Sequence, residues 1–326
     1  WNDREAPFMV AQLTHSGRYS HPTGEGDEAI IPQHHPPRDE LVGVDGDYPV
    51  VTDEYLEGLR EKYVHAARLA RDAGFDAVDI KACHGYLLGE LLASFNREGR
   101  YGGSFENRTR LLLEIIDDVR AEVGDDVLVA TRLSAYDGIP HPWGWGIDKE
   151  DFRRPAPTEP LELMNMLARR DVRLVSITFG DPHYNPHVTR PYRSAVAGGY
   201  EAPEHPLSGL GRMVRVTAQM QRECPQVAVV GAGYSWLGRH MAQAAAGTKK
   251  EGFATFVGGG RMALAYPDFP RDILLDGALD PDKVCISCSA CAELLRAGRP
   301  TGCVVRDRDT YGPIHRKLRE ETSAGG

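Results

Sequence analysis

The stretch Phe75-Asp-Ala-Val-Asp-Ile80, followed at once by Lys81-Ala-Cys-His-Gly-Tyr86, decides the fold. Its first half is a short run rich in residues that favour strands, which predicts a strand. Its second half places lysine, histidine and tyrosine directly after that strand. Helical stretches are expected on both sides, at 54–72 and 105–122. A strand flanked by helices in this way is typical of a β/α unit in a parallel sheet.

The same alternation continues along the chain, with six expected strands and five expected helices. The strands are 8–13, 75–80, 127–133, 173–178, 226–231 and 252–257. The helices are 54–72, 105–122, 159–169, 210–222 and 236–246. The helix 105–122 has its apolar residues at helical spacing, on one face. These residues are Leu111, Leu112, Ile115, Ile116 and Val119.

Polar or glycine residues follow every expected strand at its carboxyl end. They are Gln12-Leu-Thr-His15-Ser-Gly-Arg18, Lys81–Tyr86, Arg132, Thr178-Phe-Gly-Asp181, Gly231-Ala-Gly233 and Gly258-Gly-Gly-Arg261. In a β/α barrel this end of the strands carries the active site, and the last two loops bind phosphate through backbone N–H groups. We therefore predict an α/β fold, a (β/α)8 TIM barrel whose first two units are absent from this chain. An open six-stranded α/β sheet is the alternative.

Four cysteines near the carboxyl end indicate a metal centre. Cys285, Cys288 and Cys291 are spaced three residues apart, and Cys303 follows after eleven intervening residues. Four such thiolates hold an iron–sulfur cluster. A four-cysteine zinc site is the alternative, although zinc sites usually combine two separated Cys-x-x-Cys pairs. The other two cysteines, Cys83 and Cys224, lie far away in apolar segments.

The composition is that of a soluble enzyme. The 326 residues are 41% hydrophobic and carry a formal net charge of −9, which argues against nucleic-acid binding as the main role. No apolar run approaches the ~20 residues of a membrane span, and the first 15 residues lack the apolar core of a signal peptide. Reduced cysteines indicate the cytoplasm. Assembly into a homo-oligomer stays open.

A set of longer motifs runs in order along nearly the whole chain. They are Gln12-Leu-Thr-His-Ser-Gly-Arg-Tyr-Ser20, Ala73–Ile80, His84-Gly-Tyr-Leu-Leu88, Arg100-Tyr-Gly-Gly-Ser-Phe-Glu-Asn-Arg108, Arg132-Leu-Ser134, Gly258-Gly-Gly-Arg-Met262 and Cys285–Cys291 with Cys303. With them the chain resembles the old yellow enzyme-like NADH:flavin oxidoreductase family. It resembles specifically the iron–sulfur branch that contains 2,4-dienoyl-CoA reductase and trimethylamine dehydrogenase. This resemblance implies an FMN-binding barrel over residues 1–276, comprising strands 3 to 8, and a 4Fe–4S cluster segment over 277–326.

The resemblance also implies which residues bind the cofactors. Gln12 would hydrogen-bond the polar edge of the flavin, and Arg132 would place positive charge near its N1 and C2 oxygen. A structural salt bridge is the alternative for Arg132. The FMN phosphate would be bound by Gly233, Tyr234, Gly259, Gly260 and Arg261, and the cluster by Cys285, Cys288, Cys291 and Cys303.

The catalytic residues follow from the same resemblance. Tyr86 matches the family's proton donor, and Lys81 and His84 match the pair that holds the substrate's activating oxygen. Many relatives have histidine or another uncharged residue in place of Lys81. Its ammonium would lower the pKa of Tyr86 and ease proton release. The alternative for Lys81 is that it pairs with Asp79 or another acid. The alternative for Tyr86 is a packed tyrosine at the base of the following helix.

Two segments are candidates for substrate contacts. The insert Ala135–Pro157, with Trp143 and Trp145, is expected to cover the mouth of the site. The polar loop Asp181–Arg190 follows another strand, and an ordinary surface loop is its alternative interpretation. Its polarity favours a substrate with a carbonyl, carboxylate or amine group. The candidate substrate residues are His15, His183, Tyr184, His187 and Arg190.

Three functions are compatible with these residues. The first is reduction of an activated C=C bond in an enone or enoyl compound, with Tyr86 as proton donor. The second is oxidation of a small amine or N-methyl compound, bound by aromatic faces of Trp143, Trp145 and Tyr184, with electrons leaving through the cluster. The third is a non-catalytic electron relay. Electrons would be exchanged with NAD(P)H or with a donor or acceptor protein.

Overall fold

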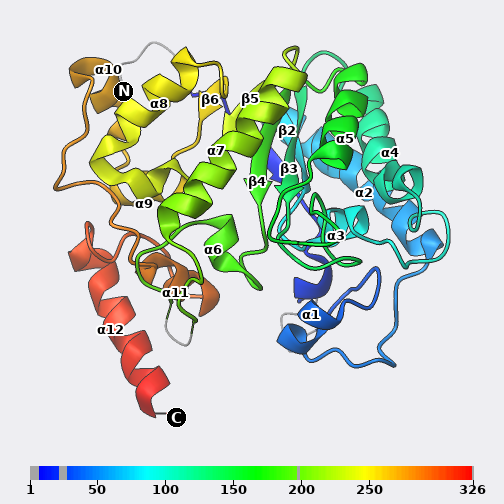
Figure 1. The fold of residues 1–326 in the computed structure, drawn as a ribbon, viewed down its shortest axis with the longest axis horizontal. Helices are drawn as coiled ribbons and strands as arrows, with labels where there is room; N and C mark the ends of the chain where they lie inside the picture. Colours follow the sequence, from blue (N-terminus) through cyan, green and yellow to red (C-terminus); the bar gives the residue numbers. More distant parts are fainter. Residues whose placement is uncertain (1–6, 22–27, 197–198, 325–326) are drawn as a thin grey trace.

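A computed structural model describes residues 7–21, 28–196 and 199–324. Its centre is one parallel sheet of six strands in sequence order (Figure 1). The strands are β1 (Val10–Leu13), β2 (Ala77–Ala82), β3 (Leu128–Tyr136), β4 (Leu174–Phe179), β5 (Ala228–Gly231) and β6 (Phe256–Val257). All six expected strands are confirmed, with ends that differ from the predicted ones by a few residues.

The register of the sheet brings site residues side by side. Gln12 of β1 lies opposite Asp79 of β2, and Lys81 of β2 lies opposite Arg132 of β3. Among the described strands, β6 does not pair with β1, so these six strands form an open sheet and not a closed barrel. Eight strands are needed to close such a barrel. The parallel β/α architecture is confirmed, and the two absent units remain a prediction.

Helices follow the strands, as the sequence predicts, and α2, α4 and α5 are grouped on one side of the sheet (Figure 1). The helices in the strand region are η1 (Gly17–Tyr19), α1 (Pro36–Asp39), η2 (Glu40–Val42), α2 (Asp53–Asp72), α3 (Leu87–Leu92), α4 (Phe105–Val123), α5 (Thr158–Arg169), α6 (Pro186–Thr189), α7 (Pro206–Glu223), η3 (Tyr234–His240) and α8 (Met241–Lys250). The expected helix 236–246 is divided between η3 and α8, and Gly238, inside η3, has non-helical backbone angles.

Local signals explain where the long helices begin. The Thr52 hydroxyl accepts a hydrogen bond from the Tyr55 N–H (3.2 Å) at the start of α2, and Ser104 does the same for Asn107 (3.3 Å) at the start of α4. The expected apolar face of α4 is buried against β2 and β3 in the main core. This packing fixes β2, whose six residues are all buried, and with it the chain that follows toward Tyr86.

The carboxyl-terminal part packs around a smaller core. Its helices are α9 (Gly260–Ala265), α10 (Phe269–Asp276), α11 (Ala290–Arg296) and α12 (Arg308–Ala324). Leu279 and Val284 pack against Tyr234 and Met262, so this core includes residues on both sides of position 276. The helix α12 points away from the rest of the molecule in Figure 1. In the part of the chain that the structure describes, no helix is long and apolar enough to cross a membrane.

Candidate functional site

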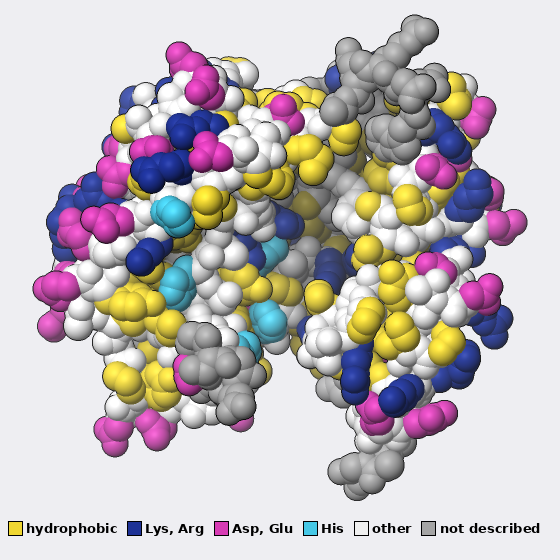
Figure 2. Space-filling model, turned by 180° about the vertical axis from the view of Figure 1, so that it is seen from behind, with side chains coloured by type: hydrophobic (Ala, Val, Ile, Leu, Met, Phe, Trp, Pro, Cys, Tyr) yellow, Lys and Arg dark blue, Asp and Glu magenta, His cyan; other side chains and the backbone are white. Residues whose placement is uncertain are grey.

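A cleft of about 780 Å³ lies at the carboxyl ends of the strands, within the ~300–1,000 Å³ typical of small-molecule sites. Figure 2 shows the molecule hollowed between its two halves, with Lys, Arg and His side chains along the walls. Residues from the turn after β2, from β3, from β4 and the loop that follows it, and from both glycine loops contribute to the lining. Among them are His84, Tyr86, Arg132, Arg190, Gly233 and Arg261. The sequence thus predicted the place of the cleft.

His84 enters the cleft from a tight turn after β2, where its backbone φ is 65°. Its Nε2 lies 2.8 Å from the Thr178 hydroxyl at the end of β4. Burial, reinforced by the positive charges of Arg132 and Lys81, lowers the pKa of His84 well below its ordinary value. His84 is therefore neutral at physiological pH, and Nδ1 is the ring nitrogen left for a ligand.

Lys81 and Tyr86 contact each other directly. The Lys81 Nζ lies 3.3 Å from the centre of the Tyr86 ring, and burial lowers the pKa of Lys81 to about 8. Burial, the Asp181 carboxylate and Cys83 raise the pKa of Tyr86 above its usual 10. The expected net lowering of the Tyr86 pKa is therefore not found, because burial and the neighbouring acidic groups raise it.

The first three strands hold Gln12, Asp79 and Arg132, one on each strand. The Gln12 Nε2 donates to the Asp79 Oδ2 (2.7 Å), so this amide has a protein partner and does not line the cleft. No ion pair joins Asp79 to Lys81 among the described residues, and Arg132 has none there either, which removes the salt-bridge alternatives for both cations. The Nε of Arg132 is buried without a hydrogen-bond partner in the described chain. Such a donor in a cleft suits an anionic or carbonyl group of a ligand.

The two glycine loops form the far end of the cleft, where the Gly258 N–H donates to the Gly231 carbonyl (2.8 Å). Gly233 has a φ of 94°, which a residue with a side chain rarely adopts. Of the predicted phosphate residues, Gly233, Gly260 and Arg261 line the cleft. Two do not. Tyr234 turns its side chain inward, with its hydroxyl 2.9 Å from that of Thr248, and a Cβ on Gly259 would lie 2.6 Å from the Phe269 ring.

The predicted substrate residues, four of them in the loop after β4, lie in different places. His183 and Arg190 line the cleft. Tyr184 lines a smaller pocket beside it. The ring of His187 is instead 2.6 Å from the Tyr200 hydroxyl, and His15 lies 3.0 Å from the Tyr55 hydroxyl. The structure therefore brings two of the five predicted substrate residues into the cleft.

The tryptophans of the insert after β3 do not cover the cleft. Trp145 is fully buried, its Nε1 donates to the Ser134 carbonyl (2.8 Å), and its ring lies parallel to that of Phe105. The prediction that it faces a substrate is wrong, because its indole completes the core. Trp143 does not line the cleft either, and its carbonyl lies 3.1 Å from the His35 Nε2.

Sequence reasoning missed the group that supports the cleft beside Tyr86. The buried Arg38 Nε donates to the Asp181 Oδ2 (2.7 Å), and the Tyr19 hydroxyl donates to the same oxygen (3.1 Å). The Tyr19 ring also stacks on His183, with ring centres 4.0 Å apart. Arg38 and Asp181 are 143 positions apart in the sequence, and no motif or spacing links them.

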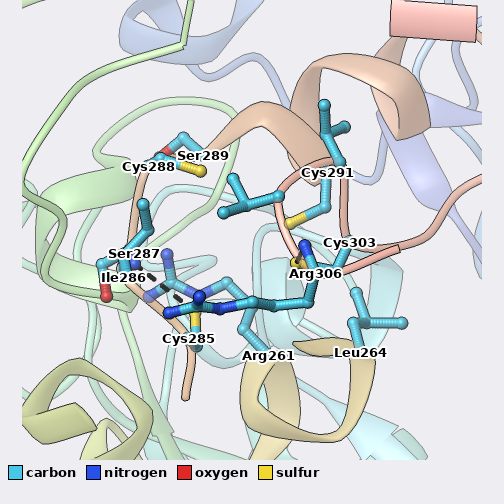
Figure 3. Close-up of a pocket in the computed structure, with 12 residues that line it drawn as sticks. Arg261, Leu264, Cys285, Ile286, Ser287, Cys288, Ser289, Cys291, Cys303 and Arg306 are labelled. Carbon is cyan, nitrogen blue, oxygen red and sulfur yellow. Dashed lines mark hydrogen bonds between the residues drawn. The ribbon is translucent and has the colours of Figure 1, made fainter. Parts of the chain in front are cut away.

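All four carboxyl-terminal cysteines line one pocket, together with Arg261 and Arg306 (Figure 3). The Ser287 N–H donates to the Cys285 sulfur and the Arg306 N–H to the Cys303 sulfur, each at 3.4 Å. Burial raises the pKa of Cys291, and the Arg261 guanidinium opposes that rise. Hydrogen bonds and cationic neighbours of this kind stabilise thiolates.

The cysteine pocket does not have the geometry of a single-ion site. Within the described residues, no three His, Cys, Asp or Glu side chains are arranged to hold one metal ion. The four sulfurs of a zinc site would have to approach each other to ~3.8 Å, as Zn–S bonds of ~2.3 Å require. The cysteines of a four-iron cluster each bind a different iron and stand farther apart. The pocket, about 20 Å³ in volume, would have to widen to admit a cluster.

The sequence of the chain is similar to known oxidoreductases. Residues 3–146 match the model of the NADH:flavin oxidoreductase / NADH oxidase family. The NADH:flavin oxidoreductase FG08077 of Gibberella zeae is 38% identical over 40% of this chain and 32% of its own length. A metal reductase of Desulforamulus reducens is 26% identical over 92% of this chain and 40% of its own. The dimethylamine dehydrogenase of Hyphomicrobium is 29% identical over 72% of this chain and 28% of its own length.

Solved structures support the fold. The structure of 2-naphthoyl-CoA reductase with 2-naphthoyl-CoA matches with a TM-score of 0.67 and 23% identity over 92% of this chain and 42% of that one. An old yellow enzyme homologue from Zymomonas mobilis matches with a TM-score of 0.56 and 23% identity. The match covers 84% of this chain and 68% of that one. This chain spans less than half the length of the three sequence relatives. Its residues 3–146 are similar to the NADH:flavin oxidoreductase / NADH oxidase family, and FG08077, the 38% identical relative, is itself an NADH:flavin oxidoreductase.

Proposed function

We propose that the cleft binds FMN and that the chain catalyses reduction of an activated C=C bond in an enone or enoyl substrate. Gly233, Gly260 and Arg261 would hold the phosphate, and the unpartnered Nε of Arg132 would face the polar edge of the flavin. Bound FMN would supply the hydride for the β-carbon of the substrate. The observation that carries the proposal is that Tyr86 and neutral His84 line the same cleft as both glycine loops.

The side chains at the end of β2 would act on the substrate's carbonyl and α-carbon. Neutral His84, fixed by Thr178, would offer Nδ1 to the carbonyl oxygen, on which negative charge develops during reduction. Tyr86 stays protonated at neutral pH, because its pKa is raised, and would give its proton to the α-carbon. The Lys81 ammonium on its ring would then stabilise the phenolate that remains until solvent returns the proton.

The cysteine pocket is proposed to hold a 4Fe–4S cluster, which would place the chain in the iron–sulfur branch of the NADH:flavin oxidoreductase family. The four thiolates supply the donor set of such a cluster, and the two N–H···S contacts stabilise it further. Arg261 lines both the cysteine pocket and the cleft, so the two proposed cofactor sites share this residue. Electrons would come from NAD(P)H or from a partner protein in the cytoplasm.

The test uses the full chain, purified without oxygen and loaded with FMN. We expect NADH or dithionite to bleach the flavin absorbance at about 450 nm, and 2-cyclohexenone to restore it with formation of cyclohexanone. A flavin that is bleached by trimethylamine or dimethylamine, and not reoxidised by any enone, would favour amine oxidation instead. A flavin that exchanges electrons only with a redox protein would favour the relay function.

The amine-oxidising function has less support in this cleft. Its proposed aromatic cage consisted of Trp143, Trp145 and Tyr184, and none of the three lines the cleft. Trp145 belongs to the core. The relationship to dimethylamine dehydrogenase keeps this function as the second candidate.

A further inference from the structure

A side pocket of about 230 Å³ opens next to the cleft. The two spaces share three lining residues, namely His183, Arg190 and Arg296. Arg190 directly follows the short helix α6, and Arg296 is the last residue of α11, the helix that carries Cys291. Two arginines from distant parts of the chain therefore meet in the wall between the cleft and the side pocket.

Arg190 lacks a carboxylate partner. No Asp or Glu of the described chain forms an ion pair with it, and its guanidinium donates no hydrogen bond there. The charges around it are chiefly positive: burial, with Arg261 and Arg296 nearby, lowers the pKa of Arg190 to about 10. It still carries its charge at neutral pH. A half-buried cation among other cations is costly unless an anion joins it.

Arg296 is anchored close to this position. Its Nη2 donates to the Pro182 carbonyl (2.8 Å), while the rest of the side chain is exposed. Arg261, the other cation nearby, is tied to the Pro191 carbonyl (3.0 Å) and faces the cysteines and the proposed phosphate site. Arg190 and Arg296 are thus the two cations at this wall that have no role in the proposed FMN and cluster sites.

The surroundings indicate what kind of anion would bind. The side pocket also contains Leu41, Tyr184 and Tyr192, which offer an apolar and aromatic wall. Arginine guanidinium groups bind carboxylates through paired hydrogen bonds. An organic acid with an aromatic or aliphatic body fits this combination better than a small inorganic anion does.

We propose that Arg190 and Arg296 form a carboxylate-binding site, and that the enzyme acts on unsaturated substrates that carry a carboxylate remote from the reacting double bond. The inference rests on the proposed function, since it assumes that the double bond lies beside Tyr86. The carboxylate would lie in the shared wall and the apolar body of the substrate would extend along the side pocket.

A matched pair of probes tests the site, namely 4-(3-oxobut-1-enyl)benzoate and its methyl ester, which present the same enone with and without a charge. Binding to the FMN-loaded full chain is measured by titration calorimetry, and FMN content is measured separately. We expect the carboxylate to bind about tenfold more tightly than the ester, the size of one charge-assisted hydrogen bond. This advantage should shrink as salt is added.

Variants locate the effect. Arg190→Met and Arg296→Met should each remove most of the carboxylate's advantage and leave ester affinity within about twofold, because only the charged contact is lost. Arg299→Met is the matched control. Arg299 lies three residues beyond Arg296 and pairs with Glu321 on the surface, so its removal changes the net charge equally without touching the wall. This control should keep the full preference.

The outcomes separate the two proposals. Equal affinity of the wild-type chain for both probes would overturn the carboxylate site, even if both are reduced. Loss of FMN from Arg190→Met, with the preference for the carboxylate unchanged, would assign Arg190 to the cofactor and also overturn it. Tight, arginine-dependent binding of the carboxylate without reduction of either probe would support the site and contradict the proposed reaction.

Discussion

The ammonium of Lys81 lies 3.3 Å from the centre of the Tyr86 ring. Both residues belong to the strand end and turn that the sequence singled out, yet the lysine contacts the tyrosine instead of lining the cleft. A cation on an aromatic face contributes ~0.5–2 kcal/mol, and more when water is excluded. The contact therefore holds the Tyr86 ring in place and puts a positive charge against the face of its phenol ring.

The first prediction concerns the Tyr86 hydroxyl. Tyr86→Phe keeps the ring on which Lys81 lies and removes only the O–H. Turnover of an enone should fall by ~10²–10⁴-fold, the usual contribution of a general acid, while FMN content and flavin reduction by dithionite stay unchanged. Steady-state kinetics with 2-cyclohexenone measures the loss. Tyr101→Phe, whose hydroxyl faces Glu57 and Glu114 between α2 and α4, is the control. Normal turnover by Tyr86→Phe would mean that water is the proton donor.

The second prediction concerns the pH dependence of turnover. Because the pKa of Lys81 is lowered to about 8, its positive charge disappears as pH rises through that value. In the wild type, kcat/KM for an enone should therefore decline above pH 8. Lys81→Met should be slower at pH 7 and should lack that alkaline limb. A variant with the same rate and the same profile as the wild type would exclude Lys81 from the reaction.

The third prediction concerns the stability effect of the same lysine. Its pKa is about 8 in the folded chain against an ordinary 10.5, so between these values the unfolded state binds more protons than the folded state. Linkage requires that this group's contribution to the free energy of unfolding rises with pH across that window. Urea unfolding at pH 7.5, 9 and 10 should show the wild type gaining stability relative to Lys81→Met. A constant difference would mean that the pKa of Lys81 is not lowered.

Local patterns in the sequence predicted much of the fold and part of the site. The strands and helices were predictable because apolar periodicity is a local property. The place of His84 just after β2 followed from them, whereas β3 runs past Arg132 to Tyr136. Partners distant in sequence were not predictable. Arg38 reaches Asp181 only because the folded chain brings their loops together, and Trp145 packs beside Phe105 of a helix 40 residues earlier. The kink at Gly238 was not predicted either, because a glycine inside a helical pattern does not by itself end the helix.

The fourth prediction concerns the cysteine pocket. Cys288→Ala removes one of the four ligands, so anaerobically purified protein should lose most of its iron and acid-labile sulfide, and the segment after Cys285 should become sensitive to proteases. Cys224→Ala is the control, because Cys224 lies outside the pocket at the end of α7. Iron analysis of both proteins decides the matter. Zinc in place of iron in the wild type, or iron retained by Cys288→Ala, would contradict the cluster.

The fifth prediction concerns the phosphate end of the cleft. Gly233 combines a φ of 94° with a position where a Cβ would lie 2.9 Å from the Met213 sulfur. Gly233→Ala should therefore strain this loop by ~1–3 kcal/mol. FMN affinity, measured by quenching of flavin fluorescence, should fall about tenfold or more.

The matched control for the loop is Gly247→Ala. Gly247 lies in α8, where a Cβ would meet nothing within 4 Å, so the change should leave FMN binding as it is. Alanine should also stabilise that helix by ~0.5–1 kcal/mol.

Denaturing the loaded wild-type protein should release FMN, because the glycine loops provide one terminal phosphate site. Release of FAD, or undiminished FMN affinity in Gly233→Ala, would place the cofactor elsewhere in the cleft.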